Sequence, residues 1–231
     1  MIGDPVALTV RRRIERPSAA LVARFAGLPT GFVTDALNGF GSMHYRVKPI
    51  APEMSFCGTA VTAYCSPMDN LAVMAALDFV QPGDVIVCAT QGQEAGGTIG
   101  DLWAAGAKAR GVAALVTDGL VRDVAGLLKI GLPIFAIGHN PNSAFKNGPG
   151  TVNHAISCGG VPVSPGDIVV GDRDGVVVVP RAEAEAVSAQ LEVVKKKEAD
   201  TEARVLSPAG KTMSFWTEEG AKARGGVRYV D

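Results

Sequence analysis

Two short segments of the chain hold the residue types that could do chemistry. The first runs from Gly92 to Trp103 and has glycines at 92, 96, 97 and 100, ahead of a predicted helix that starts at Asp101. Glycines let the backbone approach a ligand closely, and the free N–H groups at a helix start suit a carboxylate or phosphate. The segment also fits a flexible strand-to-helix loop with Asp101 as the helix cap. It matches neither the dinucleotide-binding fingerprint nor the P-loop.

The second segment is Asp118-Gly119-Leu120-Val121-Arg122-Asp123, which directly follows a predicted strand ending at Thr117. Ligands of open α/β sheets bind outside the carboxyl ends of the strands, so Arg122 and Asp123 stand at a functional position. If the strands ending at Ala89 and Thr117 are neighbours, the two segments lie close together. Taken alone, the Arg-Asp pair has an alternative interpretation as a surface ion pair or helix cap.

The two segments together predict one kind of chemistry. Mg²⁺ requires oxygen ligands, and one or two carboxylates plus waters often suffice. An arginine beside the metal can hold a carboxylate or a developing enolate oxygen. Helix N-terminal amides can bind the other end of a 2-oxo acid. These parts would stabilise the enolate of pyruvate, which is the common intermediate of aldol cleavage and β-decarboxylation.

The elements that must position these segments follow an α/β pattern. Between residues 84 and 137, continuous apolar strands alternate with helices, which is typical of a sheet that is covered on both faces and at least partly parallel. The predicted strands are Asp84–Ala89, Val112–Thr117 and Pro133–Ile137, and the predicted helices are Asp101–Arg110 and Val124–Ile130.

The flanking regions are predicted from local signals. Ser18 is a predicted N-cap, a second helix is predicted to begin at Thr30, and residues 47–65 are predicted to form strand, turn and strand. A further helix is predicted over Pro67–Leu77. Beyond residue 150 the pattern is β, with strands predicted over 160–163, 168–170 and 176–179. Asp-Gly tolerates positive φ, so Asp172–Gly175 is predicted to be a hairpin turn.

Composition and charge argue against several classes of protein. Hydrophobic residues are 47% and charged residues 19% of the chain, as in ordinary globular proteins. The net charge of −1 argues against nucleic-acid binding through bulk charge. His44, His139 and His154 have no metal-ligand spacing, which argues against a zinc site, and the four separated cysteines suggest buried free thiols. No secretion signal or apolar run of membrane-spanning length is visible, so a cytoplasmic protein is expected.

The sequence over residues 96–136 resembles the RraA-like family. The pieces that carry the resemblance are Gly-Asp-Leu-Trp at 100–103 and Asp-Gly-x-x-Arg-Asp at 118–123. It extends over most of the chain, from Thr34-Asp35-Ala36-Leu37 through Phe56–Ala60 to Gly171–Val176. The family includes the 4-hydroxy-4-methyl-2-oxoglutarate / 4-carboxy-4-hydroxy-2-oxoadipate aldolases and the regulator of ribonuclease E activity.

The resemblance implies a fold, an assembly and a set of site residues. The implied fold is a swivelling-type β/β/α domain, assembled as a homotrimer or hexamer with sites at subunit interfaces. Arg122 would contact the substrate oxygens, and Asp123 would ligate Mg²⁺ or Mn²⁺. Asp101 would act catalytically by orienting a metal-bound water or Arg122. The implied substrate-binding residues are Gly100, Asp101, Leu102, Trp103 and Arg122.

Two functions remain open from the sequence. One is a metal-dependent aldolase or lyase that acts on 4-hydroxy-2-oxo acids, with oxaloacetate decarboxylation as a side or main activity. The other is a non-enzymatic, protein-binding regulator of an RNA-degrading enzyme. The regulators end soon after the Gly-Asp-x-Asp-Gly strand, whereas this chain continues for some fifty residues, as the aldolases do. That favours the enzyme.

The C-terminal region is predicted to be an arm. The catalytic domain is predicted over residues 1–180, and residues 181–231 are predicted to form a charged helix, over 181–204, and a tail that pack on a neighbouring subunit. A carboxylate of the helix could reach a partner's metal site and complete its outer shell, and Glu198 is the first candidate. A solvated helix face with ion pairs between successive turns is the alternative.

Overall fold

The structure, a computed structural model, describes residues 6–208, 210 and 214–230. The chain divides into two compact units, Met1–Leu191 and Glu192–Asp231. The predicted boundary after residue 180 falls just before the last helix of the first unit, and the units divide within that helix. Both chemistry-bearing segments belong to the first unit.

The first unit is built on a nine-stranded sheet with the order β1-β10-β3-β4-β6-β8-β2, in which β13 also pairs with β3 and with β14. Two smaller sheets are formed by β11 and β12 and by β5, β7 and β9. The strands are β1 (Leu8–Val10), β2 (Lys48–Pro49), β3 (Phe56–Cys65), β4 (Asp84–Ala89), β5 (Gly97–Ile99), β6 (Ala114–Thr117), β7 (Leu120–Val121), β8 (Ile134–Ala136), β9 (Gly138–His139), β10 (Gly150–Val152), β11 (Ile156–Cys158), β12 (Val161–Val163), β13 (Ile168–Asp172) and β14 (Gly175–Val179).

The centre of the main sheet is parallel, as predicted. Strands β3, β4, β6 and β8 pair in parallel, and every residue of β4 and β6 is buried. The pairing of Cys88 with Thr117 makes β4 and β6 neighbours. The two chemistry-bearing segments were expected to lie close together if these two strands were neighbours, and they are.

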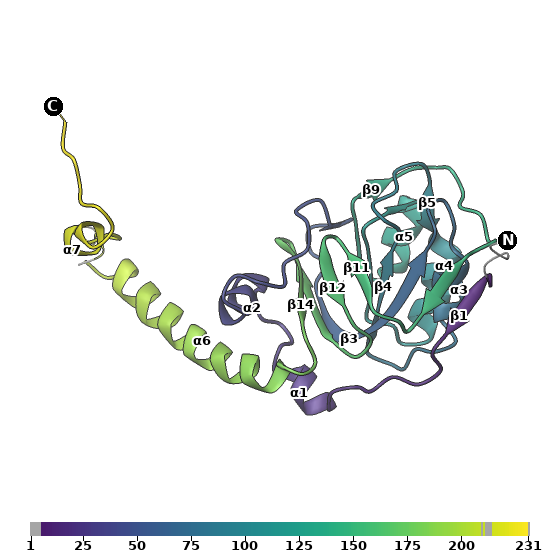
Figure 1. Ribbon diagram of the computed structural model, residues 1–231, viewed down its shortest axis with the longest axis horizontal. Coiled ribbons are helices and arrows are strands. Elements are labelled where there is room, and N and C mark those ends of the chain that lie inside the picture. The colour runs from purple at the N-terminus through teal and green to yellow at the C-terminus, as the bar shows by residue number, and fades with distance from the viewer. Residues whose placement is uncertain (1–5, 209, 211–213, 231) are drawn as a thin grey trace, which may run out of the picture. The chain divides into compact units, whose positions relative to one another are not determined.

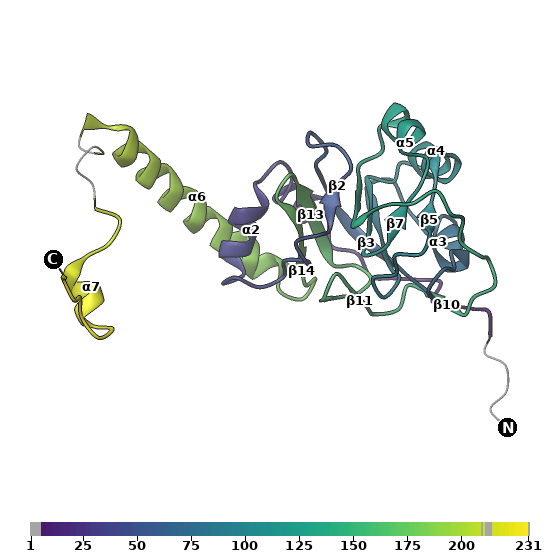
Figure 2. The same cartoon turned by 90° about the horizontal axis from the view of Figure 1, so that it is seen from above.

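Helices cover one face of this sheet and a β-hairpin covers the other (Figures 1 and 2). Three helices form this layer: α3 (Leu71–Ala76), α4 (Asp101–Ala109) and α5 (Val124–Ile130). The other helices are α1 (Ala19–Ala23), α2 (Thr30–Ala36), α6 (Ala184–Leu206) and α7 (Glu218–Lys222). Trp103 of α4 and Leu127 of α5 pack against the side of the sheet that carries Ile86. Ile156 and Val163 of the β11–β12 hairpin pack on the opposite side. The predicted α/β class is confirmed, with helix, sheet and hairpin as successive layers.

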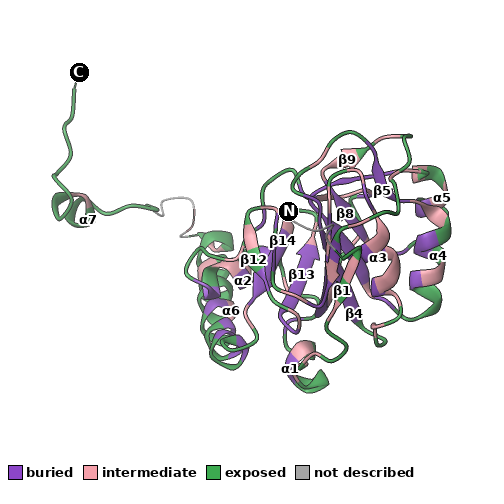
Figure 3. Cartoon of the chain, turned by 45° about the vertical axis from the view of Figure 1, so that its right-hand side comes forward, coloured by how far each residue is buried: buried purple, intermediate pink, exposed green. Residues whose placement is uncertain are grey.

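Burial follows these layers (Figure 3). The central strands are buried, whereas α4 and α5 bury only the side chains that face the sheet. Both helices match their prediction closely, because Asp101 and Val124 each follow a strand and Gly131, in the left-handed region at φ 69°, ends α5. The Ser18 cap is confirmed, since its side chain accepts a hydrogen bond from the Leu21 N–H.

Some boundaries differ from the prediction. Helix α3 begins at Leu71 rather than at Pro67, since the Asp69 carboxylate accepts the Leu71 N–H and ends the preceding turn. Strands β5 and β7 were not predicted, because three and two residues are too few to show a period. The hairpin turn is confirmed by the pairing of Asp172 with Gly175. Among the described residues, no helix is both long and apolar enough to cross a membrane.

Candidate functional site

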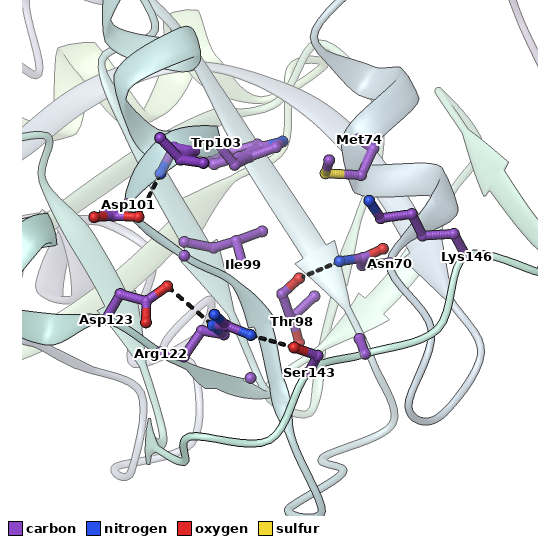
Figure 4. A pocket seen from close by; sticks show the side chains of 14 residues that line it. Asn70, Met74, Thr98, Ile99, Asp101, Trp103, Arg122, Asp123, Ser143 and Lys146 are labelled. Carbon is purple, nitrogen blue, oxygen red and sulfur yellow. Dashed lines mark hydrogen bonds and ion pairs between the residues drawn. The ribbon is translucent and has the colours of Figure 1, made fainter.

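The two segments meet at a pocket of about 390 Å³, next to the small sheet β5-β7-β9. Parts of α3, β5, the start of α4, the β7–α5 connection and the segment before β10 line the pocket (Figure 4). The lining residues are Asn70, Met74, Gly97 to Trp103, Arg122, Asp123, Ser143, Ala144 and Lys146. Apart from Glu198, all the predicted site residues lie here. Glu198 belongs to the second unit, and its role stays a prediction.

Arg122 is held in place from both ends. Its backbone N–H donates to the Ile99 carbonyl over 2.9 Å, which fixes the β7 end against β5. Its guanidinium donates through Nε to Asp123 Oδ2 over 2.9 Å and through Nη1 to Ser143 Oγ. About a third of each side chain of the Arg122–Asp123 pair is exposed. The pair therefore forms part of the pocket wall, with the guanidinium oriented before any ligand arrives.

Asp123 has an uncommon backbone conformation. Its φ of 59° and ψ of 40° lie in the left-handed region, and it stands at the N-cap of α5 without making a side-chain capping bond. Aspartate tolerates this region better than most residues do. Strained backbone of this kind is often found at functional sites. Here it leaves the carboxylate directed to the pocket instead of to the helix.

The start of α4 forms another wall of the pocket. The N-cap is Gly100, so the alternative in which Asp101 caps the helix is wrong. Asp101 is the first helical residue, and its Oδ1 accepts the N–H of Leu102 over 2.8 Å. The Trp103 ring is buried and donates through Nε1 to the Val73 carbonyl. Trp103 therefore offers a ligand its backbone, while its ring anchors α4 to α3.

Three glycines allow the charged groups to approach one another. A Cβ on Gly97 would lie 2.8 Å from Arg122 Cβ, and one on Gly100 would lie 2.3 Å from Asp123 Oδ2. A Cβ on Gly126 would lie 2.4 Å from Asp101 Oδ2. Each distance is shorter than real Cβ contacts, so any larger residue displaces a site side chain. This explains why residues 97, 100 and 126 are glycines.

The Asp118-Gly119 dipeptide forms the turn that leads into β7. The buried Asp118 carboxylate accepts hydrogen bonds from the N–H of Thr90 over 2.6 Å and from its hydroxyl over 3.1 Å. A Cβ on Gly119 would lie 2.6 Å from Thr90 Oγ1. The motif therefore ties the ends of β4 and β6 together at the start of the connection that leads to Arg122.

Five residues of the pocket, all outside the two segments, were missed from the sequence: Asn70, Met74, Ser143, Ala144 and Lys146. Figure 4 shows Asp101 and Asp123 on one side of the pocket and Lys146 on the other, near Asn70. Asn70 donates to the Thr98 carbonyl over 3.0 Å. No local motif marks these residues, because they reach the site through isolated β-bridges that join Asp69 to Phe145 and Gly97 to Ser143.

The donor set of the pocket fits a hard cation. Its charged lining consists of two carboxylates, Asp101 and Asp123, and two cations, Arg122 and Lys146. No histidine or cysteine lines it, and the described part of the chain contains no group of three or more histidine, cysteine, aspartate or glutamate residues that could hold a metal. A Mg²⁺-like ion needs only one or two carboxylates when waters and substrate oxygens complete its shell. Asp123 fits that role, whereas a metal held only by protein ligands does not fit.

The cysteines lie outside the pocket. The hydrogen bond between Cys65 and Cys88 lowers the pKa of Cys65 and, with burial, raises the pKa of Cys88. Burial raises the pKa of Cys57 to about 12 and raises the pKa of Cys158 as well. Because the thiolate is the nucleophilic form, these side chains act as small apolar groups. The prediction that they are buried free thiols is confirmed for Cys65, Cys88 and Cys158, while Cys57 is partly exposed.

Comparisons with known proteins show the family of the chain. The family model described as "RraA-like: Aldolase/RraA" matches residues 30–178, which include both segments. The chain belongs to the RraA-like family. A family relative from Halalkalibacterium halodurans, named "Putative 4-hydroxy-4-methyl-2-oxoglutarate aldolase", is 40% identical over 194 residues, covering 84% of this chain and 91% of the relative.

Solved structures of similar fold include other RraA-like proteins. One is Streptomyces coelicolor RraAS2, described as an unusual member of the RNase ES inhibitor RraA protein family, with a TM-score of 0.75 and 29% identity. The match covers 82% of this chain and 99% of RraAS2. An uncharacterized protein from Pseudomonas syringae has a TM-score of 0.74 and 26% identity, with 87% and 92% of the two chains covered. The RraA-like family thus includes proteins with aldolase and with inhibitor names.

Proposed function

We propose that the protein is a divalent-metal-dependent lyase that cleaves 4-hydroxy-2-oxo acids to pyruvate. Its substrates would be 4-hydroxy-4-methyl-2-oxoglutarate or 4-carboxy-4-hydroxy-2-oxoadipate, with oxaloacetate decarboxylation as a related activity. The observation that carries the proposal is the Arg122 guanidinium, fixed between Asp123 and Ser143 in one pocket with the start of α4. The name of the 40% identical relative supports the same reaction class.

The residues of the chain have separate parts in this reaction. Arg122 binds the oxygens of the 2-oxo acid and stabilises the negative charge that develops on the enolate oxygen. The backbone from Gly100 to Trp103 binds the substrate carboxylate near the positive end of the α4 dipole. Asp101 orients a water molecule beside Asp123 for proton transfer. Since Arg122 is already oriented, little reorganisation is needed when charge develops.

Asp123 would hold the metal ion. Mg²⁺ or Mn²⁺ bound there supplies a Lewis acid for the keto group of the substrate. A carboxylate of Glu198 from a neighbouring subunit would complete the outer shell. Asp123 remains the direct protein ligand, so metal affinity should depend chiefly on its charge.

A protein-binding regulator of an RNA-degrading enzyme is the second candidate. The observation that favours it is the likeness to RraAS2, whose chain is covered almost completely. Against it stands the pocket, since binding a protein partner does not require charged groups preorganised around a small cavity. Catalytic turnover therefore distinguishes the two functions.

The proposal is tested by pyruvate release from oxaloacetate and from both hydroxy-oxo acids. Chelation should abolish release, and added Mg²⁺ or Mn²⁺ should restore it. Asp123→Asn keeps a residue that tolerates the left-handed region but removes the charge, so its activity should recover partly at high Mg²⁺. Full activity in excess chelator would contradict the metal route. Absence of turnover on all three substrates would favour the regulator.

A further inference from the structure

One buried carboxylate does not line the pocket, but it forms hydrogen bonds with a segment that does. Asp69 lies just before α3, is 5% exposed, and has no cationic partner among the ion pairs of the described residues. Its charge is balanced by backbone N–H groups instead. Oδ1 accepts from Leu71 over 2.8 Å, and Oδ2 accepts from Asn147 over 2.6 Å and from Gly148 over 3.0 Å.

The N–H groups of Asn147 and Gly148 belong to a segment that lines one side of the pocket. Residues 142–148 carry Ser143, which receives the Arg122 guanidinium, and Lys146, which lines the pocket. The segment has no regular helix or strand of its own. At its start, the Gly97 N–H donates to the Asn142 carbonyl over 2.9 Å, and in its middle Phe145 exchanges two backbone hydrogen bonds with Met68 and Asn70.

Asp69 fixes the far end of this segment. Burying a carboxylate without a cation is costly, so the three N–H groups are held strongly to it. The bonds join the start of α3, which supplies Asn70 and Met74 to one wall, to the segment that supplies Ser143 and Lys146 to another. Lys146 lies next to Asn147, one of the two donors.

We propose that Asp69 is a positioning residue of the active site, which holds segment 142–148 so that Lys146 and Ser143 face the substrate and Arg122. The inference rests on the proposed function for its kinetic readout alone. Its structural part concerns the order of the segment and is independent of any reaction. Asp69 touches neither substrate nor metal.

The experiment compares Asp69→Asn with Asp167→Asn. Asp167 is a matched control, since it is 6% exposed and also accepts two backbone N–H groups, from Ser164 over 2.7 Å and Arg181 over 2.8 Å, but does not line the pocket. In Asp69→Asn the side-chain NH₂ must face a backbone N–H, which breaks at least one of the bonds. Both variants should lower the melting temperature, and this shared loss removes stability as an explanation for any other difference.

Two further readouts separate positioning from stability. Hydrogen exchange of the amides of residues 143–148 should be faster by about tenfold or more in Asp69→Asn and unchanged in Asp167→Asn. The KM for oxaloacetate should rise by about tenfold in Asp69→Asn because substrate binding must then reorder the segment. Its kcat should fall by less than about threefold, since Arg122 keeps its bond to Asp123, and Asp167→Asn should keep both constants.

The outcomes decide the proposal. The proposal is overturned if the amides of residues 143–148 exchange as slowly in Asp69→Asn as in the wild type. It is also overturned if Asp69→Asn and Asp167→Asn have the same KM for oxaloacetate. If Asp69→Asn does not fold, Asp69→Glu replaces it, because the longer side chain keeps the charge but displaces the two N–H groups, and the same rise in KM is expected. If the wild type turns over nothing, the proposed function fails, and the exchange result alone decides the role of Asp69.

Discussion

Arg122 and Asp123 are adjacent in the sequence, yet their proposed parts in the reaction differ. The guanidinium of Arg122 makes two directed bonds, to Asp123 Oδ2 and Ser143 Oγ, and Gly97 packs against its Cβ. The planar fork of arginine permits both bonds at once, whereas the ammonium of lysine is a point charge on a flexible stem. The geometry of the pair, and not the presence of a positive charge alone, distinguishes a site residue from a surface ion pair.

Arg122→Lys should therefore lower kcat by about 10²-fold or more, as expected when a preorganised donor to a developing oxyanion is lost. The melting temperature should change little, because the side chain is partly exposed and its ion pair contributes about 0–1 kcal/mol. Steady-state kinetics with oxaloacetate, alongside thermal unfolding, measure both effects. A variant with wild-type kcat/KM would show that the pair is only a surface ion pair.

The glycine at the start of α4 offers a test of steric spacing. Gly100 has φ −131° and ψ −168°, an extended conformation that alanine also adopts. In Gly100→Ala, however, the new Cβ would lie 2.3 Å from Asp123 Oδ2 and must displace the carboxylate. We expect weaker Mg²⁺ affinity and a loss of kcat/KM of about tenfold to 10²-fold, the upper figure being the loss that a 1 Å misplacement can cause.

Gly106→Ala is the matched control in the same helix. Its Cβ would meet nothing closer than 3.6 Å, at Arg110 Nη1. Alanine in a helix interior is more stable than glycine by about 0.5–1 kcal/mol, so this variant should gain stability and keep its activity. Equal activity in Gly100→Ala and Gly106→Ala at limiting Mg²⁺ would contradict the proposed arrangement of Asp123 beside α4.

At the scale of elements, the sequence predicts the helices and strands that are long and have a periodic or continuous hydrophobic pattern. Strand β4 and helix α5 were predicted with their observed bounds because each is a continuous apolar or amphipathic run between turn residues. The neighbouring ends of β4 and β6 placed the Gly92–Trp103 segment beside Arg122. The sequence could therefore predict that residues of both segments lie together, and they line one pocket.

The remaining wall of the pocket could not be predicted, for a physical reason. Asn70 and Lys146 come from segments more than seventy residues apart, joined by single β-bridges and by the Asp69 carboxylate. Short strands such as β5 and β7 owe their existence to partners distant in sequence, so no local period reveals them. The conformation of Asp123 likewise depends on the β7–α5 connection rather than on its own propensity.

The packing of α1 on β3 yields a prediction about stability and pH. Cys57 of β3 donates through Sγ to the Val22 carbonyl of α1 over 3.5 Å, and burial raises its pKa from 9.0 to about 12. A thiol with a raised folded-state pKa contributes stability below pH 9, and this contribution is lost as pH rises toward 12. The free energy of unfolding should therefore fall above pH 9.

The contribution of Cys57 is isolated by comparing the wild type with Cys57→Ala in urea unfolding at pH 8, 9, 10 and 11. Above pH 9 the wild type should lose about 1.4 kcal/mol per pH unit more than the variant. Other alkaline titrations are common to both proteins and cancel in the difference. Parallel pH profiles would show that Cys57 ionises as readily in the folded protein as in the unfolded chain.

At the scale of the whole molecule, the pocket of one chain offers few groups to a metal. Asp123 is its proposed direct ligand, and Asp101 already accepts the Leu102 N–H. The second unit contains the rest of α6, in which Glu198 is exposed. We expect a homotrimer or hexamer in which Glu198 of one subunit serves the Asp123 of another, and light scattering at micromolar concentration measures the assembly.

Mixing two impaired variants tests whether the site is shared. Asp123→Asn and Glu198→Gln should each form the normal oligomer with reduced activity. If one site takes Asp123 and Glu198 from different subunits, random mixed oligomers contain about one site in four with both residues intact, because each interface pairs the two subunit types independently. Denaturing and refolding an equimolar mixture at limiting Mg²⁺ should therefore restore about a quarter of wild-type activity, whereas each variant refolded alone should keep only its own reduced activity. If both carboxylates act within one chain, every site keeps one defect and the mixture has only the mean activity of the two variants. That result would remove Glu198 from the shared site, and a monomer with full activity would remove the assembly as well.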